Sequence, residues 1–511
     1  MKKTAVILIL ATLFIPALNV FATAPAGFSG GVYNEYQYEE IVFITGEPIK
    51  FIGELEVKEK KKDNLKTVEY KFDLKTSPEY DDLDGELRRK IKLEITYDDR
   101  DEKGQVISHT KLDKYKEDIK LEGKKIGKVQ YELEDFQLSK SDVIDKRPAS
   151  DYYQGNIKGR KYYTINDDEG TVIVDITGGD VGYENFWGDT ETKLINYTIS
   201  YNRLIPEDDD DKEAINWTGT VMVNVSDSTT KNLIYNDNQA NLSSFNGGYI
   251  KTENREVVSK YTFNLPNMRS NKYYLGFGNT GQIQLSKKMV PKIERLIVPK
   301  FRDLAGHLSK SQIEKLYSLG IFEGKKGQQF FSPDIPITRG EFTKALVKIC
   351  DIKLEDENKK RTISIRGNNK AKEEPLNFID IKKDDQLYKY VKAAHEKGII
   401  EGITPLRFKP KSTITKAQAI TSIIRALGFQ NKAPNPGYYT SFTDSNEIPY
   451  WAKDSIYIAN EIDIINGNEA GKIYPNKELT RAETSQIFVR LLKFLERDLQ
   501  KDYREKIILF N

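Results

Sequence analysis

A basic residue directly follows a threonine at the start of three predicted helices in the C-terminal part of the chain: Arg339, Lys416 and Arg481. The N-terminus of a helix is the positive end of its dipole and is the less favourable end for a cation. The same end offers backbone N–H groups that bind anions. A cation beside free N–H groups suits a carboxylate. We interpret these residues as ligand-binding; the alternative is a solvated basic side chain at a tolerant position.

The residues around each cation form a helix-capping pattern. A threonine at the N-cap accepts a hydrogen bond from the N3 amide, and a glutamate at N3 returns one to the N-cap amide. The pattern occurs twice with glutamate and once with glutamine: Thr338 and Glu341, Thr415 and Gln418, and Thr480 and Glu483. These residues predict helix starts and need no ligand to explain them.

The capping pattern closes a longer unit that occurs three times after residue 300. Each unit opens with Phe-x-Asp, continues through a predicted helix and a glycine turn, and passes a proline before the threonine. From the opening acid (Asp303, Asp380 or Asp444) to the threonine the spacing is 35, 35 and 36 residues. Such constancy is typical of a structural repeat. We place the repeats at 301–350, 378–429 and 442–495, followed by a tail at 496–511.

Residues 301 to about 495 resemble three tandem S-layer homology repeats, through Thr-Arg-Gly-Glu at 338–341, Thr-Arg-Ala-Glu at 480–483 and a degenerate copy at 415–418. The resemblance implies a pseudo-threefold bundle of helices. It also implies grooves that bind secondary cell-wall polysaccharide, commonly through a pyruvylated sugar whose charge meets the motif arginine. By position that role falls to Arg339 and Arg481. Lys416 is a weaker candidate, because a lysine cannot grip a carboxylate with two parallel bonds.

Four more residues take expected roles from their place in the repeat. Asp303, Asp380 and Asp444 are expected either to accept hydrogen bonds from sugar hydroxyls or to cap the first helix. Trp451 matches the family's aromatic position in the third repeat and could stack on a sugar face, whereas the other two repeats have Leu308 and Gln386 there.

Before the repeats, apolar and polar residues alternate along many segments, for example 68–74, 91–97, 195–201 and 221–225. Period two with one polar face indicates antiparallel strands buried on one side. We predict two all-β, sandwich-like domains at 23–150 and 151–290, with a break near 147–159, and a connector at 290–299. Residues 84–85 and 167–170 are predicted hairpin turns, and 178–183 is a predicted glycine-rich loop.

The β-rich part has no recognisable catalytic constellation. His109 is its single histidine, and the sequence contains no HExxH, P-loop or nucleophile-elbow pattern. Paired carboxylates for glycoside cleavage stay open, because acidic residues are abundant and only geometry selects them. The acidic run 207–211 lacks the spacing of an EF-hand and is better explained as a solvated loop than as a Ca2+ site. No metal or other cofactor is predicted.

The N-terminus has the pattern of a signal peptide at 1–22, with Lys2 and Lys3 before an apolar run and Ala22 at the predicted cleavage site. The alternative is an uncleaved anchor, but the run is short for a membrane span. The net charge of +2 gives no general attraction to nucleic acid. Cys350 is the single cysteine, so no internal disulfide forms, and we expect it to be a small buried apolar group.

Two classes of function follow. The first is a non-catalytic, exported bacterial surface protein that the repeats hold on the cell wall, such as an S-layer subunit, scaffold or adhesin. Such a protein could also self-assemble into a surface layer. The second is a wall-anchored glycan hydrolase with its active site in the β-rich part. The missing catalytic constellation favours the first. Neither class involves nucleic acid, or a membrane once the signal peptide is cleaved.

Overall fold

The computed structural model describes residues 30–124, 127–206, 212–236, 248–269, 272–298, 301–324, 328–354, 376–434 and 438–505. The predicted signal peptide and the acidic run 207–211 lie outside the described residues. Within those ranges no helix has the length and apolar character needed to cross a bilayer.

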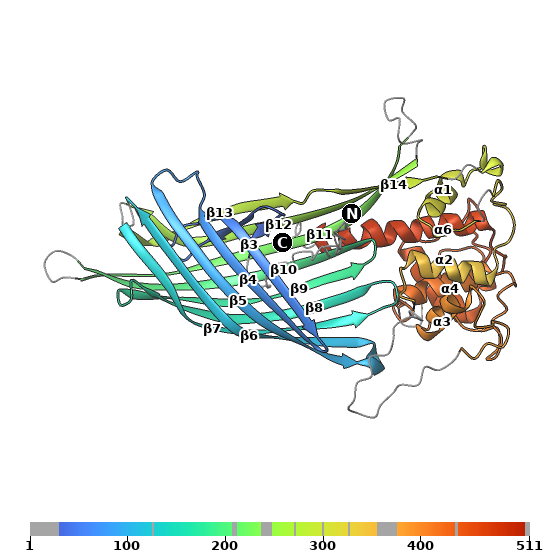
Figure 1. Cartoon of the computed structure of the whole chain (residues 1–511), viewed down its shortest axis with the longest axis horizontal. Coiled ribbons are helices and arrows are strands. Elements are labelled where there is room, and N and C mark those ends of the chain that lie inside the picture. The colour runs from blue at the N-terminus through green and yellow to red at the C-terminus, as the bar shows by residue number, and fades with distance from the viewer. Residues whose placement is uncertain are drawn as a thin grey trace, which may run out of the picture.

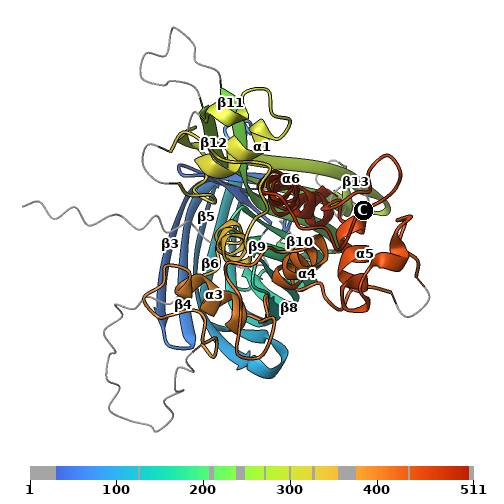
Figure 2. The ribbon, with the colours of Figure 1, turned by 90° about the vertical axis from the view of Figure 1, so that its right-hand side faces the viewer.

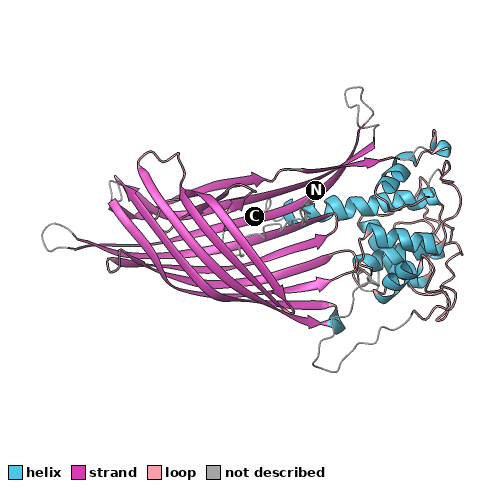
Figure 3. Cartoon of the chain, in the orientation of Figure 1, coloured by secondary structure: helices cyan, strands magenta, loops and turns pink. Residues whose placement is uncertain are grey.

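The β-rich part is one antiparallel sheet that curls along its length (Figures 1 and 3). Its strands pair in sequence order from β1 to β13, and β14 pairs with β12. The strands are β1 (Val32–Tyr33), β2 (Tyr38–Val42), β3 (Ile49–Lys62), β4 (Leu65–Thr76), β5 (Leu83–Arg100), β6 (Gln105–Gly123), β7 (Gly127–Lys146), β8 (Asp151–Ile165), β9 (Gly170–Asn185), β10 (Gly188–Pro206), β11 (Lys212–Asn236), β12 (Gly248–Arg269), β13 (Lys272–Lys288) and β14 (Lys292–Ile297). A 3-10 turn, η1 (Asp101–Lys103), joins β5 to β6.

The first strands of the sheet lie against the last ones. The Tyr33 hydroxyl donates to the Asp227 carboxylate at 2.5 Å, and Lys287 Nζ donates to Gln37 Oε1 at 2.8 Å. The Tyr261 hydroxyl also donates to the carbonyl of Gly30. These contacts bring the two ends of the sheet together, so the sheet is a nearly closed tube.

The alternation predicted from the sequence is present in the strands. In β4 the side chains of Val68, Tyr70, Phe72 and Leu74 are at most 5% exposed, while the polar residues between them are exposed. The apolar side chains belong to one cluster that draws on strands all round the sheet. The alternation therefore buries one face of these strands and leaves the other polar.

The prediction of two separate sandwiches is wrong. Strands β7 and β8 pair from Tyr131 with Ile165 to Lys146 with Asp151, directly across the predicted break. Residues 84–85 lie inside β5 and residues 178–183 inside β9, so neither is a turn or loop. A Cβ added at Gly178 would lie 2.2 Å from the carbonyl oxygen of Leu194, so this glycine permits a close approach of strands rather than a turn.

The predicted hairpin at 167–170 is confirmed. It joins β8 to β9, and Asn166 and Asp167 take the positive φ angles, 45° and 64°, that such turns need. The predicted connector at 290–299 instead contains β14, which extends the sheet.

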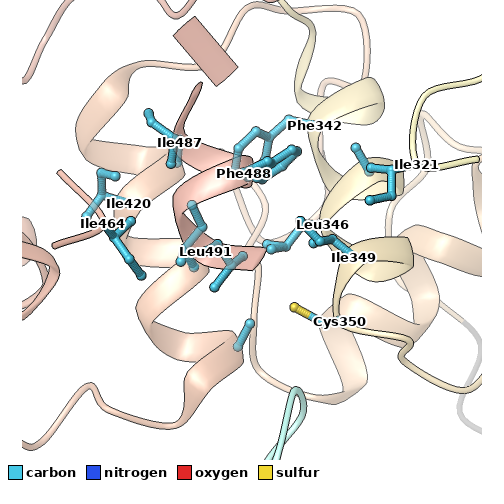
Figure 4. Packing of buried hydrophobic residues seen from close by; sticks show 14 of the residues in the cluster. Ile321, Phe342, Leu346, Ile349, Cys350, Ile420, Ile464, Ile487, Phe488 and Leu491 are labelled. Carbon is cyan, nitrogen blue, oxygen red and sulfur yellow. The ribbon is translucent and has the colours of Figure 1, made fainter. Parts of the chain in front are cut away.

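Each repeat contributes two helices. They are α1 (Lys310–Ser318) and α2 (Arg339–Ile349), α3 (Tyr388–Glu396) and α4 (Lys416–Leu427), and α5 (Lys453–Glu461) and α6 (Arg481–Lys493). The 3-10 turns η2 (Arg302–Leu304), η3 (Ser445–Glu447) and η4 (Tyr450–Ala452) accompany them, and η5 (Phe494–Asp498) and η6 (Lys501–Glu505) continue α6 with π-helical turns. Phe342 and Leu346 of α2 meet Phe488 and Leu491 of α6 in the core (Figure 4). Cys350 is buried beside them, and burial raises the pKa of its thiol to about 12, as expected for an inert cysteine.

The helical repeats and the sheet share one buried core, which includes Trp187 and Tyr249 from the strands. The indole nitrogen of Trp187 donates to the carbonyl of Ile349 at 2.7 Å, and the Ala149 amide donates to the carbonyl of Ala426 at 2.9 Å. Figure 2 views the molecule from the helical end, with α6 beside the strands. The repeats are therefore docked on the sheet rather than linked to it by a free connector.

Part of the predicted tail belongs to this docking. Residues 496–505 are helical and lie against strands β9 to β12. Thr192 donates to the carbonyl of Tyr503 at 2.6 Å, Gln500 donates to Ser228 at 2.7 Å, and Arg504 donates to Glu256 at 2.6 Å. Successive side chains of a strand point to opposite faces, and Thr192 lies on the face of β10 opposite to the inward residues. This helix therefore covers the outer face of the sheet.

Candidate functional site

All three capping boxes predicted from the sequence are confirmed. The N-cap threonines Thr338, Thr415 and Thr480 accept hydrogen bonds from the N3 amides of Glu341, Gln418 and Glu483 at 3.3, 3.4 and 3.1 Å. Each N3 side chain returns a bond to the N-cap amide. Local sequence alone therefore sets where α2, α4 and α6 begin.

The backbone amides at these helix starts are not free, contrary to the anion-site prediction. They donate to carbonyls of another repeat, because a helix leaves its first amides without partners of its own. The bonds run from Arg339 to Ser412 (2.8 Å) and Gly340 to Pro410 (2.9 Å), from Lys416 to Lys477 (2.9 Å) and Ala417 to Pro475 (2.8 Å), and from Arg481 to Ile335 (3.0 Å) and Ala482 to Pro333 (2.8 Å). The first repeat thus binds the second, the second the third, and the third the first.

Arg339 is held inside the contact between the first two repeats. Its Nε donates to the carbonyl of Phe408 at 3.0 Å and its Nη2 to the carbonyl of Glu401 at 2.8 Å. The guanidinium lies 4.8 Å from the centre of the Phe408 ring, and the residue is only 7% exposed. Burial lowers the pKa of Arg339, and Asp380 opposes that shift.

Arg481 takes the equivalent place between the third and first repeats. It donates to the carbonyl of Phe331, and its guanidinium lies 4.3 Å from the centre of the Phe331 ring. Burial lowers the pKa of Arg481, against the nearby charges of Glu341 and Asp303. The Nε group is buried and has no hydrogen-bond partner within the part of the chain that the structure describes.

Lys416 lies between the second and third repeats, and no aromatic ring lies against it among the described residues. The position held by Phe331 and Phe408 in the other grooves is Ile473 here. Burial lowers the pKa of Lys416, with Glu483 opposing the shift. Arginine therefore occurs over phenylalanine and lysine over isoleucine, as expected if ring stacking favours the planar guanidinium.

The opening aspartates fix the loop beneath each cation. Asp303 accepts hydrogen bonds from the amides of Phe331 (3.0 Å) and Ser332 (2.6 Å). Asp380 accepts from Phe408 and Lys409, and Asp444 from Ile473 and Tyr474. None of the three carboxylates accepts a hydrogen bond as the cap of the helix or turn that follows it, so that alternative is wrong. The carboxylates serve a loop whose second residue has a positive φ of 60° at Ser332.

Trp451 lies in η4 and is 55% exposed, next to the 93% exposed Tyr450. Its stacking on a sugar stays a prediction. The corresponding Leu308 in the first repeat is 94% exposed and offers no ring.

A buried ion network inside the sheet escaped the sequence analysis. Arg89 donates to Glu40 at 2.8 and 2.9 Å and to Glu117 at 2.8 Å, and Lys161 reaches Glu117 at 3.1 Å. Burial alone would raise the pKa of Glu117, but Arg89 and Lys161 outweigh it and hold that pKa well below its ordinary value. The charged side chains lie on the inward face of β2, β5, β6 and β8. They meet only because of the order in which the strands pair and the face to which each side chain points.

A second polar region lies at the end of the sheet nearest the repeats. A cavity of about 380 Å³ is lined there by Asp189, Glu191, Asp227, Arg255 and Phe186, among others. Burial, and then repulsion from Asp227, raise the pKa of Asp189 to about 7. His109 lies in β6 as expected, and no group of three or more potential metal ligands occurs among the described residues.

Comparison with known proteins identifies the family to which the three repeats are similar. The model of the S-layer homology domain matches residues 300–343, 377–420 and 441–485. The chain is 27% identical to Exoglucanase XynX of Acetivibrio thermocellus over 369 residues, which is 71% of this chain and 29% of that protein. It is 30% identical to an Amylopullulanase of Thermoanaerobacterium thermosulfurigenes over 195 residues (38% and 9%). It is 24% identical to the Surface-layer 125 kDa protein of Lysinibacillus sphaericus over 212 residues (41% and 16%).

The chain spans less than a third of the length of each of these relatives. Its C-terminal region contains three tandem S-layer homology domains, and such domains indicate anchoring at the cell surface.

Proposed function

We propose that this protein is exported by a bacterium and held non-covalently on the cell wall by its three S-layer homology domains. The ligand is secondary cell-wall polysaccharide, bound in the grooves between repeats. The observation that carries the proposal is the threefold recurrence of one arrangement, a cation at a capped helix start above an aspartate-fixed loop of the next repeat. An acidic substituent such as a pyruvate ketal fits a cation in such a groove.

The repeats form a ring of approximate threefold symmetry in this proposal. Support comes from the cyclic order of the amide-to-carbonyl bonds, in which each repeat binds the next and the third returns to the first. A ring of this kind makes three grooves, one between each pair of neighbouring repeats, which a single wall polymer or several chains can occupy.

The curled sheet is the displayed part, and we propose that it is structural or adhesive rather than catalytic. Around Arg89 and Glu117 its interior is filled mainly by side chains, which leave a cavity of about 80 Å³ there. Several relatives are surface-layer proteins, which supports self-assembly into a surface layer as the role of this part.

A glycan hydrolase is the second candidate, for a specific reason. The match to Exoglucanase XynX is longer than the stretch from residue 300 to residue 485, so it includes sequence outside the repeats. The cavity near Asp189 holds two neighbouring acids, Asp189 and Glu191, and burial raises the pKa of both. A carboxyl whose pKa is raised by burial is suited to the general-acid role in glycoside cleavage.

The test is sedimentation of the purified protein with bacterial cell-wall sacculi. We expect the protein to pellet with untreated sacculi and to stay in solution when the wall's acidic substituents have been removed chemically. Equal pelleting with stripped sacculi would overturn the anionic ligand. Release of reducing sugar from a panel of glucans and xylans by the same preparation would favour the hydrolase.

A further inference from the structure

We infer that Lys140 and Asp180 form a covalent amide bond inside the curled sheet, with Asp142 as the group that carries protons between them. The bond is a cross-link between β7 and β9, the two strands that flank β8 (Figure 1). It is independent of the wall-binding grooves, because all three residues lie in the sheet. Cys350 is the single cysteine, so this link takes the place that disulfides have in other exported proteins.

The strand register brings the two aspartates together. Asp142 on β7 pairs with Gly155 on β8, and Gly155 pairs with Asp180 on β9, so the three residues form one row across the sheet. Gly155 has no side chain, and a Cβ added there would lie 2.0 Å from Asp142 Oδ1 and 2.3 Å from Asp180 Oδ1. The two carboxylates therefore meet over the glycine backbone, in the space that a larger residue would fill.

Lys140 reaches both carboxylates from its own position on β7. Its Nζ donates to Asp142 Oδ1 at 2.5 Å and also to Asp180 Oδ2. The side chains of Lys140, Asp142 and Asp180 are 14%, 15% and 1% exposed. Ser108 holds the other oxygen of Asp142, donating to Oδ2 at 2.8 Å. The lysine nitrogen is thus held against the carboxyl group of Asp180 and away from bulk water, where fixed proximity accelerates a reaction most.

Asp180 Oδ1 lacks the partner that a buried carboxylate oxygen needs. It has no hydrogen-bond partner within the part of the chain that the structure describes, and such an atom is costly. It lies close to Asp142 Oδ1, since both would contact the same Cβ at Gly155. Burial raises the pKa of Asp142, Lys140 opposes that shift, and the charge of Asp180 adds to it. A proton on Asp142 is therefore placed next to the oxygen of Asp180 that has to leave.

The reaction balances without any added reagent. Burial lowers the pKa of Lys140, but Asp180 and Asp142 outweigh it, so the resting form is the ammonium. The ammonium passes a proton to Asp142, and the resulting amine attacks the carboxyl carbon of Asp180. One N–C bond forms and one C–O bond breaks. Of the three ammonium hydrogens, one stays on the amide nitrogen and two leave with the Asp180 oxygen as water, relayed by Asp142. One positive and one negative charge disappear from a buried site, which removes the cost of burying them.

Lys161 shows why a buried lysine beside an acid is not sufficient. It reaches Glu117 at 3.1 Å, and both side chains are buried. Arg89 binds the same carboxylate at 2.8 Å. Burial would raise the pKa of Glu117, but Arg89 and Lys161 hold it well below its ordinary value. A carboxylate kept charged in this way is a poor target for an amine, so we expect this pair to stay ionic.

Mass spectrometry of the denatured full-length protein is the test. The unaltered protein is expected to be lighter by one water molecule than its sequence requires, once its N-terminal residue is known. A protease digest should contain one branched peptide that joins the segments around Lys140 and Asp180. Lys140→Arg should restore the missing mass, because a guanidinium keeps the charge but supplies no nucleophilic amine. Asp142→Asn should slow bond formation at least tenfold.

Lys193→Arg is the matched control. Lys193 lies opposite Asp180 on β10 but pairs with Glu191 at 3.0 Å, so this variant should still lack one water. Full mass in the unaltered protein, with Lys140 and Asp180 in separate peptides, would overturn the inference and leave the wall-binding proposal untouched. A branched peptide at another lysine would overturn it as well. Both readings come from the unaltered protein, so they decide the question even if Lys140→Arg does not fold. Bond formation at the unaltered rate in Asp142→Asn would overturn the role of Asp142.

Discussion

The capping threonines act locally, within one turn of helix. In each repeat the threonine hydroxyl binds the N3 amide, and the bond lengths of 3.1 to 3.4 Å are similar in all three. The cations that follow them act between repeats instead, through carbonyls and rings that lie far away in the sequence. Neighbouring residues of one motif thus have separable effects on stability and on binding.

Thr480→Ala is expected to lower the free energy of unfolding by about 1 kcal/mol, because the N3 amide of α6 loses its acceptor. Affinity for sacculi should be unchanged, since the hydroxyl serves only the helix start. Urea unfolding and sedimentation check the two halves of the prediction. Glu341→Gln is the matched control and should be nearly neutral, because Gln418 closes the same box in the second repeat. A large loss of affinity in Thr480→Ala would show that the threonine itself contacts the ligand.

Asp189 is expected to make stability depend on pH. Its folded-state pKa of about 7 lies above its ordinary value of 3.8, so between these values the folded protein holds a proton that the unfolded chain has released. The free energy of unfolding contributed by this residue is therefore highest below pH 4 and falls as pH rises to 7. Since one pKa unit corresponds to about 1.4 kcal/mol, the fall is on the order of 2–4 kcal/mol.

Asp189→Asn should remove that part of the pH dependence. Urea unfolding at pH 5 and pH 8 is the measurement, and the difference between the two pH values should shrink in the variant relative to the unaltered protein. An unchanged difference would mean that Asp189 ionises normally in the folded protein.

Strand pairing decides what happens inside the sheet. Arg89 on β5 meets Glu40 from β2 and Glu117 from β6, and all three are nearly inaccessible to solvent, with side-chain exposures of 2–6%. Such a network satisfies every charge only while all members are present. Polar and apolar residues alternate regularly along these strands, so the sequence predicts the strands but not the network. The network depends on the register in which the strands pair.

Arg89→Met is expected to lower the free energy of unfolding by about 3–5 kcal/mol, because it leaves the buried Glu40 without its cation and Glu117 with Lys161 alone. Arg88→Met is the matched control. Arg88 neighbours Arg89 on the opposite face of β5, its side chain is 65% exposed, and its loss should cost less than about 0.5 kcal/mol. Urea unfolding of both variants gives the comparison, and equal effects would contradict the buried network.

Docking of the repeats on the sheet makes the whole molecule one body. The shared core contains residues of both parts, and the helix after α6 lies along the outer face of β10 and β11. The wall anchor therefore holds the curled sheet in a set orientation. This arrangement differs from that of a displayed part joined to the repeats by a short connector at 290–299, which is the expectation from the sequence.

Trp187→Ala is expected to uncouple the two parts. The indole is 2% exposed and donates to the carbonyl of Ile349, so its removal leaves a cavity and an unpaired carbonyl at the contact. The loss should be about 3–5 kcal/mol, and a single calorimetric transition should split into two. Trp451→Ala, at a 55% exposed position, should leave the transition unchanged. Two separate transitions in the unaltered protein would show that the parts already unfold independently.

The sequence by itself determined the features that depend on short spacing. The capping boxes need only residues three apart, the strand faces need only alternation, and the turn at 167–170 needs only residues that tolerate positive φ. The repeat itself was visible because it places the same pattern at nearly constant intervals.

The tertiary structure alone decided the features that depend on distant partners. Alternation does not say which strand pairs with which, so one continuous sheet and two sandwiches look the same in the sequence, and only the pairing of β7 with β8 separates them. The bonds of Arg339 reach carbonyls 62 and 69 residues away, and the bond from Trp187 to Ile349 spans 162 residues. Whether a motif arginine binds a ligand or a neighbouring repeat is therefore set by the chain that folds against it, because the same guanidinium donors suit either acceptor.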